Sequence, residues 1–102
     1  MKIPLSLLRV GQQRCVKLGS VSVLVCRTES GIYAVENRCT HVNSALYGGS
    51  LEGDAIRCPF HGIKFDLRTG EPFTMGRMDS LRTFAVSIGD NHVTISEDAA
   101  AG

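Results

Sequence analysis

The stretch "RCTHVNSALY", residues 38–47, places a cysteine and a histidine two positions apart in a segment otherwise typical of a loop. Further along the chain, "RCPFHG", residues 57–62, presents a second cysteine and a second histidine. Thiolate and imidazole are common ligands of soft and borderline metals, and two side chains cannot complete a tetrahedral site. The two stretches therefore predict one shared metal site with the ligands Cys39, His41, Cys58 and His61.

The spacing of these four residues is C-x-H-x16-C-x2-H. Zinc fingers usually group cysteine with cysteine and histidine with histidine, whereas here each stretch supplies one of each. Mixed pairs suit a two-iron cluster in which two cysteines hold one iron and two histidines hold the other. The spacing favours such a [2Fe-2S] cluster, and a zinc-stabilised interaction module without redox function stays open as an alternative.

On either side of the ligand region, apolar residues alternate with polar ones, which is typical of β-strands. Residues 13–35 predict a hairpin that turns at residues 19–20 and a third strand in "IYAV", and residues 84–95 predict a second hairpin that turns at residues 89–91. One face of the first hairpin carries an apolar stripe of Val16, Leu18, Val21, Val23 and Val25. No segment shows a capped helical periodicity, so the predicted class is all-β.

Between the two hairpins, residues 37–80 hold six of the eleven glycines, two of the three histidines and two of the three prolines. This composition predicts an inserted, turn-rich cluster-binding subdomain in an antiparallel, β-sandwich-like framework. The 102 residues are enough to bury roughly two thirds of the unfolded surface. We therefore expect residues 1–102 to form a single domain.

The formal net charge is +1, from 11 basic and 10 acidic residues that are well mixed along the chain, so no nucleic-acid partner is expected. The opening "MKIPLSLLRV" is too short an apolar run for a signal peptide core, and no stretch reaches the length of a membrane span. We expect a cytoplasmic protein without a membrane partner. In that compartment four cysteines indicate metal or redox chemistry, and we interpret Cys15 and Cys26, on the face opposite the valine stripe, as packing residues.

The sequences "CTH" and "CPFHG", with the "HGIKFDLRTGEP" that follows, resemble the two cluster loops of Rieske proteins and the strand and turn after them. The resemblance extends over nearly the whole chain and is closest to the small Rieske ferredoxins of bacterial aromatic-ring dioxygenases. It implies one [2Fe-2S] cluster, with Cys39 and Cys58 on the buried iron and His41 and His61 on the exposed iron.

The function that this resemblance implies is one-electron transfer from a flavin-dependent NAD(P)H reductase to a terminal oxygenase. The chain would be a monomeric electron carrier in a multicomponent oxygenase and not an enzyme by itself. A second reading is the small Rieske-like subunit of an assimilatory reductase such as nitrite reductase. Those subunits often lack the cluster ligands, and the complete set here argues against this reading.

The chain departs from the membrane-complex Rieske proteins at the two positions where they carry a loop-clamping disulfide, which are Ser44 and Phe60 here. We expect packing and tight turns to hold the loops instead, through Pro59, Phe60, Leu46, Gly48, Gly49 and Gly62. The stretch corresponding to the third, covering loop is "FTMGRMDS", with Gly76 in place of a proline. Met75 and Met78 there are either core-filling residues or an apolar rim beside the histidines, with Arg77 projecting toward a partner.

Rieske proteins of high reduction potential, which this chain resembles, carry a serine two residues and a tyrosine four residues after the second histidine. Their hydroxyls donate hydrogen bonds to cluster sulfur. Here the two positions are Ile63 and Phe65, and neither side chain can donate a hydrogen bond. The resemblance therefore predicts a reduction potential near the lower end of the Rieske range.

Overall fold

The computed structural model describes residues 1–39, 44–59, 62–73 and 79–97. These residues form two antiparallel sheets, and their only helical element is the short 3-10 turn η1, Leu5–Leu7. The larger sheet has the strand order β1-β9-β8-β4-β3-β2 and the smaller has the order β5-β6-β7. The strands are β1 Lys2–Pro4, β2 Gln13–Leu18, β3 Val21–Arg27, β4 Ile32–Glu36, β5 Ser50–Glu52, β6 Ala55–Arg57, β7 Lys64–Asp66, β8 Thr83–Gly89 and β9 His92–Glu97. The all-β class is confirmed.

Both predicted hairpins are present in the larger sheet. Strands β2 and β3 pair up to Leu18 opposite Val21, so that only residues 19 and 20 form the turn. Strands β8 and β9 pair up to Gly89 opposite His92, which leaves a two-residue turn of Asp90 and Asn91. Both turn residues have positive φ, 51° and 61°, as a two-residue hairpin loop with the right-handed strand twist requires. Gly89 therefore belongs to the strand and not to the turn.

Strand β3 is buried on both faces, and its alternation divides the protein into two apolar cores. Val23 and Val25 face the framework core, which also contains Ile3, Leu8, Ile32, Ala34, Phe84, Val93 and Ile95. Leu24 and Cys26 face the other way, into a second core that we call the thiol core. Its buried members are Leu24, Cys26, Val35, Cys39, Leu46, Ile56, Cys58, Phe65, Leu67 and Leu81. The valine stripe of the sequence is thus the framework side of the first hairpin.

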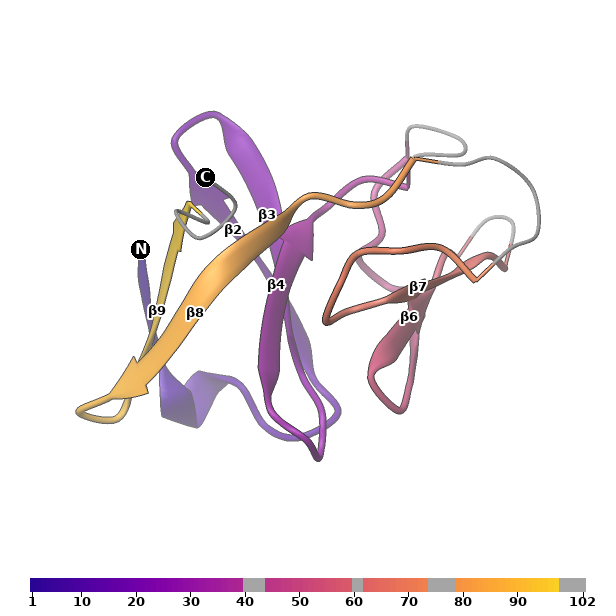
Figure 1. Cartoon of the computed structure of the whole chain (residues 1–102). Helices are drawn as coiled ribbons and strands as arrows, with labels where there is room; N and C mark the ends of the chain where they lie inside the picture. The colour runs from indigo at the N-terminus through magenta and orange to yellow at the C-terminus, as the bar shows by residue number, and fades with distance from the viewer. Residues whose placement is uncertain (40–43, 60–61, 74–78, 98–102) are drawn as a thin grey trace.

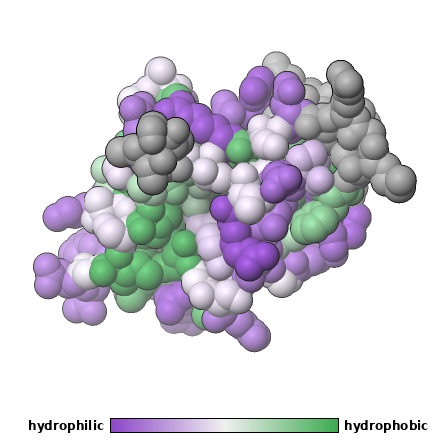
Figure 2. Space-filling model, in the orientation of Figure 1, coloured by the Kyte–Doolittle hydropathy of each residue, from purple (hydrophilic) through white to green (hydrophobic). Residues whose placement is uncertain are grey.

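The smaller sheet lies beside the larger one, on the side of β4 (Figure 1). The thiol core takes side chains from both sheets. Strands β5, β6 and β7 have three residues each, too few for alternation to reveal them in the sequence. On the face shown in Figure 2, apolar residues gather over the side of β8 and β9, away from the smaller sheet. Ile88, on β8, is exposed. None of the described segments forms a helix with the length and apolar character needed to cross a membrane.

Candidate metal centre

The first ligand loop begins just after strand β4. The backbone N–H of Cys39 donates to the carbonyl oxygen of Ser44, with a nitrogen–oxygen distance of 2.6 Å. The Cys39 side chain is fully buried, in the thiol core. The other ligand predicted in this loop, His41, lies outside the described residues, as do residues 40, 42 and 43.

The second ligand loop leaves the end of strand β6 and returns at β7. The N–H of Cys58 donates to the carbonyl of Ile63 at 2.8 Å, and the N–H of Gly62 donates to the carbonyl of Cys58 at 3.1 Å. Gly62 has φ of +71°, a backbone conformation that favours glycine. His61 and Phe60 lie outside the described residues. Both loops are therefore closed in the same way, by a bond from the cysteine N–H to the carbonyl five residues on.

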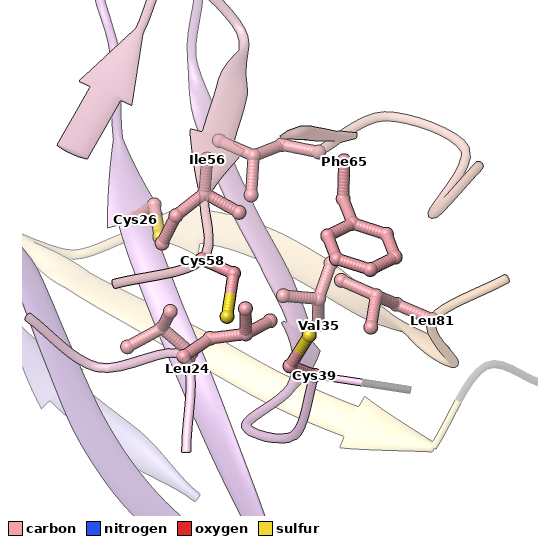
Figure 3. Close-up of a cluster of buried hydrophobic side chains, with 10 residues drawn as sticks. Leu24, Cys26, Val35, Cys39, Ile56, Cys58, Phe65 and Leu81 are labelled. Atoms are coloured by element: carbon pink, nitrogen blue, oxygen red, sulfur yellow. The ribbon is translucent and has the colours of Figure 1, made fainter. Parts of the chain in front are cut away.

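The structure brings Cys39 and Cys58 together from two different sheets into one apolar core. Their exposed fractions are 0% and 2%, and Figure 3 shows both sulfur atoms among the side chains of that core. The four cysteines, all among the described residues, form no disulfide. A thiol is a weak hydrogen-bonding group, but its thiolate is a strong soft-metal ligand. Two buried thiols that converge in this way fit the cysteine half of an iron-sulfur donor set.

Asn37 holds the far end of the first loop. Its Oδ1 accepts hydrogen bonds from the backbone N–H groups of Leu46 and Tyr47, both at 2.9 Å. Its Nδ2 donates to Ser22 Oγ at 3.2 Å and to Cys15 Sγ at 3.3 Å. One neutral amide thus fastens the returning loop to strands β2 and β3.

Gln13 on strand β2 makes a second amide contact with the same loop. Its Nε2 donates to the Gly49 carbonyl at 2.8 Å, and its Oε1 accepts from the Gly48 N–H at 2.9 Å. A side chain at Gly49 would clash with the backbone, because an added Cβ would lie 2.1 Å from the Arg57 carbonyl oxygen. Glycine at this position therefore allows the two ligand-bearing segments to approach each other closely.

Arg57, directly before Cys58, holds the second loop. Its Nη1 donates to the Gly62 carbonyl at 2.6 Å, while Nε and Nη2 donate to the two carboxylate oxygens of Glu52 at 2.6 and 3.1 Å. Lys64 Nζ lies 3.5 Å from the same carboxylate. The hydrogen bond from Arg57, with the nearby positive charges, lowers the pKa of Glu52 to about 2, and the carboxylate in turn raises the pKa of Arg57.

These contacts change the expected account of how the loops are held. Leu46 is fully buried in the thiol core, and Gly48 and Gly62 have positive φ, which confirms that part of the prediction. Pro59 is exposed, so its predicted packing role is wrong. Side-chain hydrogen bonds from Asn37, Gln13 and Arg57 do much of the holding, and the sequence prediction missed them because their partners are mostly backbone groups.

The remaining cysteines differ from each other. Cys26 is fully buried in the thiol core, which confirms its packing role, and burial raises its pKa to about 12. Cys15 is exposed and accepts the bond from Asn37, so the packing interpretation is wrong for it. Partial burial raises its pKa as well. Because a raised pKa disfavours the thiolate form, neither cysteine is indicated as a metal ligand or nucleophile.

Phe65 and Ile63, which we singled out as the positions that set the potential, adjoin the thiols. Phe65 is fully buried in the thiol core, and Ile63 is partly buried against it. Figure 3 places the Phe65 ring near Leu81, within the same group of side chains as the two sulfur atoms. The predicted covering-loop residues Met75, Gly76, Arg77 and Met78 lie outside the described residues.

A family model described as Rieske [2Fe-2S] domain matches residues 3–85. This chain belongs to the Rieske [2Fe-2S] domain family. The resemblance inferred from the two ligand stretches is confirmed, together with the Rieske fold and the Rieske-type [2Fe-2S] cluster as cofactor. The buried pair Cys39 and Cys58 is compatible with this cofactor.

Individual relatives of this Rieske chain are similar over most of its length. Ferredoxin CarAc of Metapseudomonas resinovorans is 34% identical over 84 residues, which cover 82% of this chain and 78% of the relative. A solved structure described as a complex of reduced oxygenase and oxidized ferredoxin in carbazole 1,9a-dioxygenase contains a chain that matches with a TM-score of 0.83. The two chains are 34% identical, and the match covers 92% of this chain and 88% of that one.

Another Rieske relative is much longer. Apoptosis-inducing factor 3 of Mus musculus is 36% identical over 85 residues, which cover 83% of this chain. The match covers only 14% of that protein. A Rieske unit of this kind therefore also occurs within larger proteins.

Proposed function

We propose that this Rieske protein is a one-electron carrier. It takes electrons from a flavin-dependent NAD(P)H reductase and passes them to the terminal oxygenase of an aromatic-ring dioxygenase system. The observation that carries the proposal is the pair of buried thiols, Cys39 and Cys58, in a chain that matches the ferredoxin component of a biphenyl 2,3-dioxygenase over 76% of its length.

We assign Cys39 and Cys58 to the buried iron and His41 and His61 to the exposed iron. Two neutral imidazoles in place of two thiolates make the donor set less negative by two charges, which raises the reduction potential above that of a four-cysteine cluster. All four ligand positions are then filled by side chains, so no iron is open to substrate. The chain is thus suited to electron transfer and not to catalysis by itself.

We place the partner surface at the ends of the two ligand loops. Gly48 and Pro59 are exposed there, and the exposed iron would lie close to a docked partner. We predict that the patch also includes the segment from Met75 to Met78, which lies outside the described residues, with Arg77 as a charged contact. A weakly bound carrier uses a small interface because it has to leave again. The proposed carrier is a monomer of one domain, residues 1–102, and works in the cytoplasm, where the reductase has NAD(P)H.

The alternatives remain distinguishable from this proposal. A small subunit of an assimilatory reductase such as nitrite reductase would stay bound to its large subunit and would not shuttle between partners. A zinc-stabilised interaction module would be colourless, whereas a Rieske cluster is red-brown. The complete set of Cys39, His41, Cys58 and His61 favours the iron-sulfur carrier.

The test is stopped-flow spectroscopy of the purified red-brown protein. A flavin reductase with NADH should bleach the oxidised spectrum, and an oxidised dioxygenase terminal component should then restore it within turnover time. Arg77→Glu should slow the second reaction without moving the midpoint potential, and the slowing should diminish as salt concentration rises. A colourless zinc-bearing protein, or a red-brown protein that no oxygenase can reoxidise, would contradict the proposal.

A further inference from the structure

We propose that Arg57 positions the second ligand loop and that the charges of Glu52, Arg57 and Lys64 tune the reduction potential of the cluster. The inference rests on the proposed function, because it takes Cys58 and His61 as cluster ligands. The spacing of the four predicted ligands does not point to these three residues. They emerge from the contacts between the smaller sheet and the loop.

Arg57 spans the base of the loop. It is the last residue of β6, directly before Cys58, and its Nη1 donates at 2.6 Å to the carbonyl of Gly62, directly after His61. One guanidinium therefore connects the two chain positions that flank the ligand pair. Together with the bonds from Cys58 N–H to Ile63 and from Gly62 N–H to Cys58, it gives the short loop three closures.

Glu52 fixes the other side of the guanidinium. Its two carboxylate oxygens receive Nε and Nη2 of Arg57, the forked arrangement that arginine forms and lysine cannot. The side chains of Arg57 and Glu52 are 42% and 38% exposed. An ordinary ion pair at that exposure contributes little to folding stability. Here the guanidinium donates three hydrogen bonds, so its orientation is defined although solvent reaches it. Lys64, from β7, contacts the same carboxylate at 3.5 Å.

The charges of this group act on the electron that the cluster accepts. Arg57 and Lys64 each carry a positive charge and Glu52 a negative one, so the group has a net charge of +1 beside the loop. Reduction adds a negative charge to the cluster, and a nearby positive charge favours that step. Removal of the Arg57 charge should therefore lower the potential, and removal of the Glu52 charge should raise it. Added salt should reduce both shifts, because the side chains are partly exposed.

The experiment compares Arg57→Gln, Arg57→Lys and Glu52→Gln in the cluster-loaded protein. Arg68→Gln is the matched control, since Arg68 is an exposed arginine just after β7 and pairs with Asp66, at 3.6 Å, instead of bridging the loop as Arg57 does. The measurements are the midpoint potential, the electron paramagnetic resonance spectrum of the reduced protein, the rate of iron loss to a chelator, and the thermal unfolding midpoint.

We expect Arg57→Gln to lose iron about tenfold faster, the factor that corresponds to one charged hydrogen bond, and to have a lowered potential with an altered resonance spectrum. Arg57→Lys should keep the potential near that of the wild type but still lose iron faster, since it restores the charge without the fork. Glu52→Gln should raise the potential while iron loss changes little, because an amide oxygen can still accept from Arg57. Arg68→Gln should match the wild type in all four measurements.

A purely structural role would change stability and iron loss but would not give opposite potential shifts. The inference is overturned if Arg57→Gln and Glu52→Gln move the potential in the same direction, if Arg57→Lys retains iron as well as the wild type does, or if Arg68→Gln gives shifts of equal size. Should Arg57→Gln fail to fold, the other two variants still decide the question. Failure of the proposed function itself would appear separately, as a wild-type protein that lacks the Rieske spectrum or transfers no electrons.

Discussion

The two ligand loops are closed by the same backbone hydrogen bond but supported by different chemistry. The first loop is held by the neutral amides of Asn37 and Gln13, which come from the framework sheet or its edge. The second is held by the guanidinium of Arg57, whose partner Glu52 lies on the same small sheet. The first loop is thus tied to the framework of the protein, and the side-chain hydrogen bonds of Arg57 tie the described part of the second loop to its own sheet. A protein without a disulfide between its loops can therefore hold them independently, and the two supports should fail under different conditions.

The largest effect on cluster content should come from replacing the buried cysteines, because each loop contributes one of them. Either Cys39→Ser or Cys58→Ser should give colourless and poorly folded protein, because cluster binding ties the two loops together. Cys15→Ser is the matched control, since Cys15 is exposed and outside the thiol core. Absorption spectra and iron analysis measure the outcome. A full [2Fe-2S] spectrum in Cys58→Ser would show that the ligand assignment is wrong.

The support of the first loop can be removed with Asn37→Ala. This change takes the acceptor from the backbone N–H groups of Leu46 and Tyr47 and should cost about 2 kcal/mol of unfolding free energy, at about 1 kcal/mol for each hydrogen bond. Asn37→Asp retains that acceptor and should cost less. Denaturant unfolding in low and high salt provides the measurement. The loss in Asn37→Ala should be independent of salt, and a strongly salt-dependent loss would contradict the distinction between the two loops.

The support of the second loop should respond to acid. The pKa of Glu52 is lowered from 4.5 to about 2 in the folded protein, so its ionised form is the one that folding favours. Its stabilising contribution is complete above pH 4.5 and is lost as the pH falls through the folded value of about 2. The difference in unfolding free energy between wild type and Glu52→Gln should therefore shrink between pH 5 and pH 2. A constant difference over that interval would mean that the ionisation of Glu52 does not stabilise the folded protein.

Several parts of this structure could be read from sequence because they depend on local pattern. Alternation revealed the hairpins β2–β3 and β8–β9, and ligand spacing singled out Cys39 and Cys58, which the fold brings into one core. Strands β5 and β6 escaped detection because three residues cannot establish a period, and β7 was indicated only by the family resemblance of "HGIKFDLRTGEP". The loop supports escaped for a different reason: Asn37 and Arg57 bind backbone carbonyls and N–H groups, whose positions depend on strand register and loop path. The burial of a single residue outside a pattern was also unpredictable, as the exposed Pro59 and Cys15 demonstrate.

The smallest expected effect concerns the thiol core, which both loops contact. Rieske potentials span roughly minus 150 to plus 300 mV and are tuned by hydrogen bonds to sulfur. Phe65 is fully buried beside the thiols and Ile63 is packed against them, and neither donates such a bond. We therefore expect a wild-type potential toward the lower end of that range and nearly independent of pH around neutrality, with the imidazole protons retained.

Phe65→Tyr tests whether the missing hydroxyl in the thiol core keeps the reduction potential low. A hydroxyl that reaches a cluster sulfur gains a partner and stabilises the added electron, so the potential should rise with little loss of stability. A hydroxyl that finds no partner in the thiol core would leave the potential unchanged and cost about 1–3 kcal/mol, the penalty for an unsatisfied buried polar group. Phe84→Tyr is the matched control, since Phe84 is buried in the framework core, and it should leave the potential unmoved. Voltammetry between pH 6 and pH 8 provides the measurement. A wild-type midpoint well above zero, or a steep fall with pH, would contradict this account of Ile63 and Phe65 while leaving the ligand assignment in place.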